Sequence, residues 1–472
     1  MLLTARNETG RLQNGIVRNG TLQRCAAGFL GFKSKGSWGN CRAVKRLVIF
    51  LVLLTLAGLG RAGELTKRDV LSIQGGRFFL DGSPFAEISF NKFDLFWQLY
   101  DELGAGRRLE ATNGMVRAQE RALRNLHELG FRTVRIFALP WGPEGPAAYA
   151  DPERRTRLYA ALDKTVALCE AQDIRVVWSL GAGTFTDTKL EPGRGWVFGA
   201  EQQRELVANA GSRGRQLLYR YIDETVRRYR GAKAVLMWEI SNEVTLNADI
   251  GDRERVYNGE RMPTLKEVAG FFDDVAKRIK AADPLRLVNS GGSNMREAQW
   301  HLYTGKGWQT DTLEEQFQCF ELLYGKSAVD VVDIHSYPDN HPGYGVLGND
   351  GRKAWLDDRG YMEFARRLGK PLMIGEVGLH AIAKSDRKIW GETPDYFESY
   401  GDEKAARPWV QRTLDGIIEA GVPLSYWWCY QSDRAEDQSN RQRFDLERSR
   451  EPELVNCILE ANHRLKAKLH AK

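Results

Sequence analysis

Short apolar runs alternate with longer amphipathic segments along the chain from Leu71 onward. Eight of the short runs are rich in β-branched and aromatic residues, a composition typical of buried strands. We therefore expect eight strands, over Ala86–Phe90, Thr133–Phe137, Arg175–Leu180, Val235–Ile240, Arg286–Asn289, Val329–Ile334, Pro371–Ile374 and Leu424–Trp428.

The segments between these strands carry apolar residues three or four positions apart, which predicts helices that each bury one face. Such alternation of strands and helices is typical of a parallel sheet. Eight repeats without a Gly-x-Gly-x-x-Gly turn favour a single α/β domain, a closed (β/α)8 TIM barrel, over an open doubly wound sheet. The predicted helices are Met115–Leu129, Thr156–Gln172, Gln216–Tyr229, Leu265–Ala282 and Arg407–Ala420.

Two further features accompany the expected barrel. A hairpin is predicted over Ile73–Pro84, with turns at Gly75-Gly76 and Asp81-Gly82. Long polar stretches follow four of the strands, and we expect them to be insertions on the C-terminal face, where barrel enzymes carry their active sites. The stretches are 181–213, 244–263, 339–360 and 380–406.

The first part of the chain has the features of a secretory signal peptide. Lys45-Arg46 precedes an apolar run of eleven residues, Leu47–Ala57, and the small residues Gly60 and Ala62 follow. We expect cleavage after Ala62 and a secreted or periplasmic product. The run is shorter than the roughly 18 apolar residues of a membrane span, and an uncleaved membrane anchor is the alternative.

The expected organisation is a leader over 1–63 and one barrel domain over 64–472. Residues 1–43 are polar, Gly- and Arg-rich, and lack sustained periodicity, so they do not resemble a signal peptide. One hypothesis is that translation begins at Val44 through a non-ATG start codon, which would give an ordinary signal peptide.

The formal net charge of +6 comes from the leader. Residues 1–63 contain ten Lys or Arg and one acid, so the remaining chain has 58 basic and 61 acidic residues. A nucleic-acid partner would need a basic folded face and is not expected. The six cysteines form no CxxC motif and no Cys/His cluster, which favours buried free thiols and no metal site. Export would permit one disulfide, which the sequence does not assign. No obligate protein partner is evident.

Polar residues recur where the predicted strands end. Because the carboxyl ends of parallel strands meet at one edge of a barrel, these side chains are expected to share a cleft. They are Arg135, the run Ser241-Asn242-Glu243, His335, Tyr337, Glu376 and the aromatic pair Trp427-Trp428.

Glu243 and Glu376 follow the fourth and seventh strands and are expected to face each other across the barrel mouth. Two facing carboxyl groups are what glycosidic cleavage requires, because one protonates the leaving oxygen while the other attacks or activates water. Their environments must give them different proton affinities. Arg135 is suited to supply a positive charge beside Glu376.

These motifs resemble glycoside hydrolase family 5. The resemblance covers about 65–440 and rests on Ser241-Asn242-Glu243, His335-Ser-Tyr337 and Ile374-Gly-Glu376, in order and after the expected strands. It implies a retaining glycosidase in which Glu243 is the acid/base and Glu376 the nucleophile. No cofactor is implied.

The resemblance also implies roles for the residues around the two carboxyl groups. Asn242 would bind the sugar 2-hydroxyl, Tyr337 and Arg135 would hold Glu376 ionised, and His335 would contact the acid/base. Trp427 would form the floor of the cleaved subsite. Adjacent strand residues point to opposite faces, so only one of Trp427 and Trp428 is expected in the cleft, and Trp427 is favoured.

The chain departs from the family pattern at two positions. Val244 follows the acid/base where the family usually has Pro, and no His follows the third strand, as cellulase-like members have. The run Arg132–Ala138 is more similar to the mannanase branch. The expected substrate is therefore a β-mannan or β-glucan polysaccharide or oligosaccharide.

Three alternatives differ in how well they fit this pattern of residues. A transglycosylase would use the same glycosyl-enzyme and a different acceptor. A non-catalytic carbohydrate-binding barrel would require the loss of one carboxylate, and both are present. A barrel metal hydrolase would need clustered His and Asp ligands at several strand ends, and only His335 qualifies.

Overall fold

The computed structural model describes residues 65–140, 144–181, 200–250, 262–337, 345–354, 356–378, 403–430 and 452–470 of the 472-residue chain. The chain divides into two units, residues 1–63 and 64–472. The expected leader and its cleavage position lie outside the described residues. Among the helices described, none has the length and apolar character that a membrane span requires.

A central sheet of eight strands organises the second unit. Its strands are β4 (Glu87–Asn91), β5 (Thr133–Phe137), β6 (Arg175–Ser179), β7 (Val235–Glu239), β8 (Val288–Asn289), β9 (Val332–Ser336), β12 (Leu372–Val377) and β13 (Leu424–Trp427). The order is β8-β7-β6-β5-β4-β13-β12-β9, and every neighbouring pair is parallel. A parallel bridge between Asn289 and Val331 joins the two ends of this order. The sheet therefore closes into the predicted barrel, and all eight predicted strands are present with ends shifted by a few residues.

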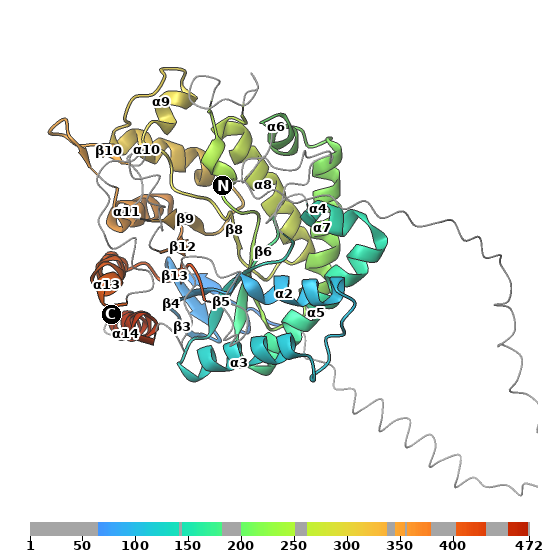
Figure 1. Ribbon diagram of the computed structural model, residues 1–472. Helices are drawn as coiled ribbons and strands as arrows, with labels where there is room; N and C mark the ends of the chain where they lie inside the picture. Colours follow the sequence, from blue (N-terminus) through green and yellow to red (C-terminus); the bar gives the residue numbers. More distant parts are fainter. Residues whose placement is uncertain are drawn as a thin grey trace, which may run out of the picture. The chain divides into compact units, whose positions relative to one another are not determined.

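Helices surround the barrel (Figure 1). All five predicted helices form, as α3 (Gly114–Glu128), α5 (Pro152–Ala171), α7 (Arg213–Tyr229), α8 (Leu265–Ala282) and α13 (Glu403–Ala420). The further helices are α2 (Asp94–Gly104), α4 (Glu144–Ala150), α6 (Ala200–Ala208), η1 (Val244–Asn247), α9 (Gln299–Tyr303), α10 (Leu313–Phe320), η2 (Glu321–Gly325), α11 (Asp358–Leu368) and α14 (Pro452–His470).

The helices begin where side chains satisfy their free N–H groups. Thr264 and Glu267 form a capping box at the start of α8, and Thr312 and Glu315 form another at the start of α10. Pro152 follows the N-cap Asp151 of α5, at a position where a missing N–H costs nothing. These local signals fix the helix starts without contacts from the rest of the chain.

The predicted insertions fall mostly outside the described residues. The parts that the structure describes include α6, η1 and a short antiparallel pair, β10 (Val346–Leu347) with β11 (Lys353–Ala354). These segments follow the third, fourth and sixth barrel strands, on the side of the strand ends.

Strand residues alternate between two hydrophobic cores because successive side chains point to opposite faces of a sheet. One core fills the barrel interior, and the other lies between the sheet and the helices. The interior core includes Val177, Met237, Val331, Met373 and Tyr426, and the helix-facing core includes Trp178, Trp238, Ile334, Ile374 and Trp427.

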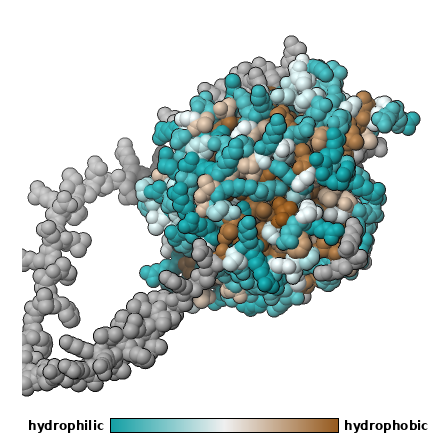
Figure 2. Space-filling model, turned by 180° about the vertical axis from the view of Figure 1, so that it is seen from behind, coloured by the Kyte–Doolittle hydropathy of each residue, from teal (hydrophilic) through white to brown (hydrophobic). Residues whose placement is uncertain are grey.

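The surface is largely polar. Figure 2 shows one face on which hydrophilic residues predominate and hydrophobic ones appear between them. Among the described residues, the large apolar side chains that are exposed are Trp308, Leu313 and Leu347. Cys169, Cys319, Cys429 and Cys457 are buried free thiols, as predicted for the described cysteines.

The predicted hairpin closes the N-terminal end of the barrel. It comprises three antiparallel strands, β1 (Ser72–Gln74), β2 (Arg77–Leu80) and β3 (Ser83–Pro84). Phe78 and Leu80 pack into the interior core. Buried Arg175 at the start of β6 donates to both carboxylate oxygens of Asp81, at 2.7 and 2.9 Å, and so ties the hairpin to the barrel. The hairpin covers only this end of the barrel, and polar residues gather at the C-terminal end.

We expect Phe78→Ala to lower the free energy of unfolding by about 3–5 kcal/mol, because the substitution leaves a cavity in the interior core. Urea denaturation measures the change. Arg77→Ala is the matched control, since Arg77 is the exposed neighbour, and it should change the stability by less than about 0.5 kcal/mol. Equal losses for both variants would contradict a buried hairpin.

Candidate active site

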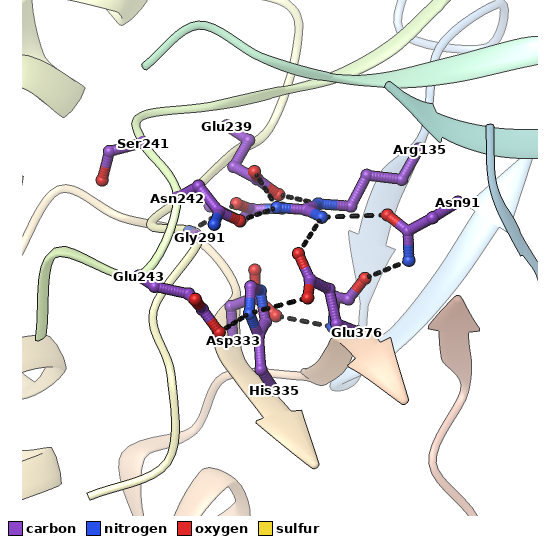
Figure 3. A network of polar contacts seen from close by, with 12 residues as sticks. Asn91, Arg135, Glu239, Ser241, Asn242, Glu243, Gly291, Asp333, His335 and Glu376 are labelled. Atoms are coloured by element: carbon purple, nitrogen blue, oxygen red, sulfur yellow. Dashed lines mark hydrogen bonds and ion pairs between the residues drawn. The ribbon is translucent and has the colours of Figure 1, made fainter. Parts of the chain in front are cut away.

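Polar side chains from five strands and the loops after them meet at the C-terminal end of the barrel (Figure 3). The group contains the predicted residues Arg135, Asn242, Glu243, His335, Tyr337 and Glu376, together with Asn91, Glu239 and Asp333. Six of the seven residues predicted from the sequence therefore lie in one site.

Arg135 on β5 is the centre of this group and is fully buried. Its Nε and Nη2 donate to the two carboxylate oxygens of Glu239, at 2.8 and 2.6 Å. Its Nη1 donates to Glu376 and to Asn91, both at 2.9 Å, and Nη2 also donates to Asn242 at 2.7 Å. All five N–H groups of the guanidinium are thereby used. Burial opposes its charge, but the Glu239 and Glu376 carboxylates outweigh burial and raise the pKa of Arg135.

Glu376 on β12 is 5% exposed and held from two sides. One carboxylate oxygen accepts from Arg135, and the other accepts from the Tyr337 hydroxyl at 2.9 Å. Burial raises the pKa of Glu376 above its usual value, while His335, Arg135 and Tyr337 oppose that rise. Burial and the Glu376 charge raise the pKa of Tyr337 well above normal, so the phenol keeps its proton and donates.

Glu243 is the more accessible of the two carboxyl groups, with 27% of its side chain exposed. Its backbone is left-handed, at φ 56°, which is uncommon for a residue other than glycine. The backbone N–H donates to Gly291 at 2.7 Å, which fixes this turn. A Cβ on Gly291 would lie 1.6 Å from the Ser241 carbonyl oxygen, so only glycine fits beside the turn.

His335 on β9 connects the two carboxyl groups. Its Nδ1 lies 2.8 Å from a Glu243 oxygen and 3.7 Å from a Glu376 oxygen. Burial alone would lower the pKa of His335, but the charges of Glu376 and Glu243 raise it to about 9. The imidazole is therefore protonated at neutral pH and donates to Glu243.

The two carboxyl groups are close to each other. One oxygen of Glu243, one oxygen of Glu376 and a ring nitrogen of His335 lie within 4.8 Å of one another. Three such atoms could approach a metal ion. The Arg135 guanidinium and the Tyr337 hydroxyl already occupy Glu376, however, and a cation next to Arg135 would be repelled. The arrangement suits proton transfer better than metal binding. That the protein binds no metal remains a prediction from the sequence.

Trp427 does not lie in this site, so its predicted placement in the cleft is wrong. Its side chain is fully buried in the helix-facing core, because it alternates with Tyr426, which faces the barrel interior. The next residue, Trp428, is two positions after Tyr426 and therefore lies on the side of the strand that faces the barrel interior. Its ring lies 5.3 Å from that of Phe93 and 6.0 Å from that of Phe137, and Gly378 separates it from Tyr337.

Three buried polar residues were not predicted from the sequence. Asn91 accepts from Arg135 and donates to the carbonyls of Gly375 and Tyr426. Glu239 and Asp333 occupy interior positions of β7 and β9. Strand alternation could have identified the two acids. Glu239 stands four positions before Glu243 and Asp333 two before His335, and an even spacing places side chains on the same face of a strand. A carboxylate in a buried strand is also unusual.

The family profile described as Cellulase (glycosyl hydrolase family 5) matches residues 104–429. The chain belongs to glycoside hydrolase family 5. It is therefore a glycosidase of the family that cleaves β-glycosidic bonds, and the resemblance seen in the sequence is confirmed.

Curated relatives of the chain are mannanases. It is 24% identical to mannan endo-1,4-β-mannosidase 1 of Oryza sativa subsp. japonica, over 72% of this chain and 76% of that protein. It is 22% identical to mannan endo-1,4-β-mannosidase 3 of Arabidopsis thaliana, over 71% and 78%.

Solved structures support the fold. The family 5 mannosidase from Rhizomucor miehei matches with a TM-score of 0.57 and 15% identity, over 86% of this chain and all of that one. The endo-β-1,4-mannanase from Thermotoga petrophila matches with a TM-score of 0.50 and 14% identity, over 81% and 77%.

We expect Arg135→Gln to lower the free energy of unfolding by about 3–5 kcal/mol at pH 7.5, because buried carboxylates lose their cation. In the variant the folded-state pKa of Glu376 rises further above its unfolded value. As the pH increases, Glu376 then loses its proton in the unfolded state before it does so in the folded state. The loss of unfolding free energy in the variant therefore grows with increasing pH. Urea denaturation at pH 5 and pH 7.5 measures both effects.

The control for this variant is Arg278→Gln, which removes a bidentate but partly exposed pair with Asp223. That loss should be about 1 kcal/mol or less. A pH-independent loss in Arg135→Gln, or equal losses in both variants, would contradict the central role given to Arg135.

Proposed function

We propose that this protein is a retaining β-mannan hydrolase that acts by double displacement, with Glu376 as nucleophile and Glu243 as acid/base. The observation that carries the proposal is that one oxygen of Glu243 and one oxygen of Glu376 lie within 4.8 Å of each other. Retaining glycosidases have carboxyl groups about 5–5.5 Å apart, whereas inverting enzymes leave about 6.5–9.5 Å for a water molecule.

In the first step an oxygen of Glu376 attacks the anomeric carbon while Glu243 donates its proton to the departing glycosidic oxygen. The glycosidic bond breaks and an ester bond to Glu376 forms. Arg135 and Tyr337 suit this step because they bind the Glu376 carboxylate and aim it. Asn242 is oriented by Arg135 and is available to bind the sugar 2-hydroxyl.

In the second step Glu243 takes a proton from water, and the hydroxide oxygen attacks the same anomeric carbon. The ester bond to Glu376 breaks, and the sugar leaves with its original configuration. His335 supports the change of role of Glu243, because its Nδ1 lies 2.8 Å from a Glu243 oxygen and holds that carboxyl group in place.

Mannan is favoured as the substrate because the curated relatives are endo-1,4-β-mannosidases and no histidine follows the third strand. A β-glucan is the second choice within the same reaction. A transglycosylase would form the same ester and pass the sugar to a carbohydrate hydroxyl, and analysis of products for elongated oligosaccharides distinguishes it from a hydrolase. The leader predicted over 1–63 from the sequence favours export, so we propose a secreted or periplasmic site of action.

We expect Glu376→Ala to lower the hydrolysis of β-mannan by about 10⁴-fold or more, because no group remains to form the ester. The assay uses β-mannan, β-glucan, xylan and aryl β-glycosides, with circular dichroism as the control for folding. Activity that survives in the folded variant would contradict the role of Glu376. Wild-type activity on β-glucan alone would contradict mannan as substrate.

Glu243→Ala is expected to behave differently with an activated substrate. A dinitrophenyl β-mannoside needs no proton for its leaving group, so the first step should remain fast while the second becomes slow. Azide should restore turnover and give the β-configured mannosyl azide, because it needs no general base. Failure of azide to restore turnover, or formation of the α-azide, would contradict the assignment.

A further inference from the structure

Asp333 is a buried carboxyl group that the proposed mechanism does not use. It lies on the interior face of β9, two residues before His335, and is fully buried. One oxygen, Oδ1, accepts from the Gly375 backbone N–H at 2.9 Å. The other, Oδ2, has no hydrogen-bond partner among the described residues. A buried carboxylate oxygen without a donor is costly, so a donor is required nearby.

The ring nitrogen Nε2 of His335 is the matching donor. It too is buried without a partner in the described part of the chain, while Nδ1 of the same ring is engaged with Glu243. A Cβ on Gly375 would lie 2.9 Å from Nε2 and 3.0 Å from Oδ2 of Asp333, so both atoms lie over the same glycine. The two atoms form no hydrogen bond in the structure, but they lie less than about 6 Å apart, and a carboxylate at such a distance favours a protonated histidine.

Charged groups from several strands surround this pair. Glu243 and Glu376 face His335 on the side of the cleft, and Arg135 faces it from β5. Tyr337 donates to Glu376 beside them. The two acids favour a charged imidazole and Arg135 opposes it.

On the floor of the site, Asp333 also faces Glu239 of β7. Burial and the Glu239 charge raise the pKa of Asp333 well above its usual value, and His335, Arg135 and the Gly375 N–H oppose that rise. Arg135 already makes a bidentate pair with Glu239. Because Arg135 is paired with Glu239, His335 is the cation that can pair with Asp333.

We propose that Asp333 is a positioning residue, whose Oδ2 attracts the Nε2–H of His335 and so holds the imidazole with Nδ1–H directed at Glu243. The inference rests on the proposed function, because it assigns the purpose of the contact to the acid/base Glu243. Asp333, His335 and Glu243 then form a line from the barrel floor to the cleft. The protein uses this line to keep a positive charge beside Glu243 when that group must act as a base.

A purely structural role makes a different prediction. If Asp333 served only to accept the Gly375 N–H, an asparagine would replace it without consequence, because its side-chain carbonyl accepts the same bond. Asp333→Asn is nearly isosteric and keeps an acceptor for the Gly375 N–H, but it replaces the acceptor Oδ2 with an amide NH2 group that can only donate. In the proposed role this variant weakens the hold on the Nε2 proton, and His335 becomes neutral at lower pH.

The first test is a titration of the full chain labelled with ¹⁵N-histidine, followed by NMR. The seven histidines give few signals, and His335→Gln identifies that of His335. In the wild type both ring nitrogens should stay protonated to about pH 9. In Asp333→Asn the midpoint should fall by about 1–3 pH units.

Glu87→Gln is the matched control. Glu87 is another fully buried barrel carboxyl group, but it is bound by Thr133 and Lys466, away from His335. This variant should leave the His335 midpoint unchanged. A midpoint unchanged in Asp333→Asn, or shifted equally by Glu87→Gln, would overturn the proposal. If Asp333→Asn does not fold, the wild-type spectrum still decides, since an Nε2 that is unprotonated at pH 7 would overturn it.

The second test is the pH dependence of kcat/KM on a mannooligosaccharide, whose poor leaving group needs the acid. Loss of the positive charge at His335 should move the falling limb of the profile up by about one pH unit in Asp333→Asn. A limb that stays in place while the NMR midpoint falls would overturn the link to Glu243. Absence of wild-type hydrolysis would refute the proposed function instead, and the NMR result would stand independently.

Discussion

The buried guanidinium of Arg135 is the interaction on which the rest of the site depends. It uses all five of its N–H groups on Glu239, Glu376, Asn91 and Asn242. Transfer of these carboxylates out of water would be prohibitive without it, because isolated buried charges cost several kcal/mol each. Arg135 thus allows the Glu376 carboxylate to be buried and fixes the direction in which it points. Because the same guanidinium orients Asn242, it connects the proposed nucleophile with the residue next to the proposed acid/base.

The barrel makes this concentration of charge possible. Its N-terminal end is closed by Phe78 and Leu80 of the hairpin and filled by an apolar interior core. Strand alternation then directs the polar side chains of β4, β5, β7, β9 and β12 inward at the opposite end. The same strands therefore contribute apolar side chains to the core at the N-terminal end of the barrel and polar side chains to the site at its C-terminal end. This division is usual for (β/α)8 enzymes, in which stability is concentrated at one end and catalysis at the other.

Much of this arrangement could be predicted from the sequence, because it depends on local signals. The eight strands follow from short β-rich runs, and Glu243 and Glu376 stand out because each directly follows such a run. Asn91, Glu239 and Asp333 were not predicted because they lie within strands, where strand alternation is the only local signal and the partners are far along the chain. Trp427 was chosen over Trp428 because the sequence does not fix which parity of β13 faces inward. Which residues of β13 face the barrel interior depends on the pairing of Trp427 with Phe90 in β4 and on the packing of Tyr426 in the interior core.

The central claim is that Glu376, held by Arg135, forms the covalent intermediate. Incubation with 2,4-dinitrophenyl 2-deoxy-2-fluoro-β-mannoside tests it most directly, since the fluorine slows release of the sugar from the enzyme. Mass spectrometry of the digested protein should find one fluoromannosyl group per chain, on the peptide that contains Glu376, and none in Glu376→Ala. A label on Glu243, or no label together with release of the inverted sugar, would contradict the account.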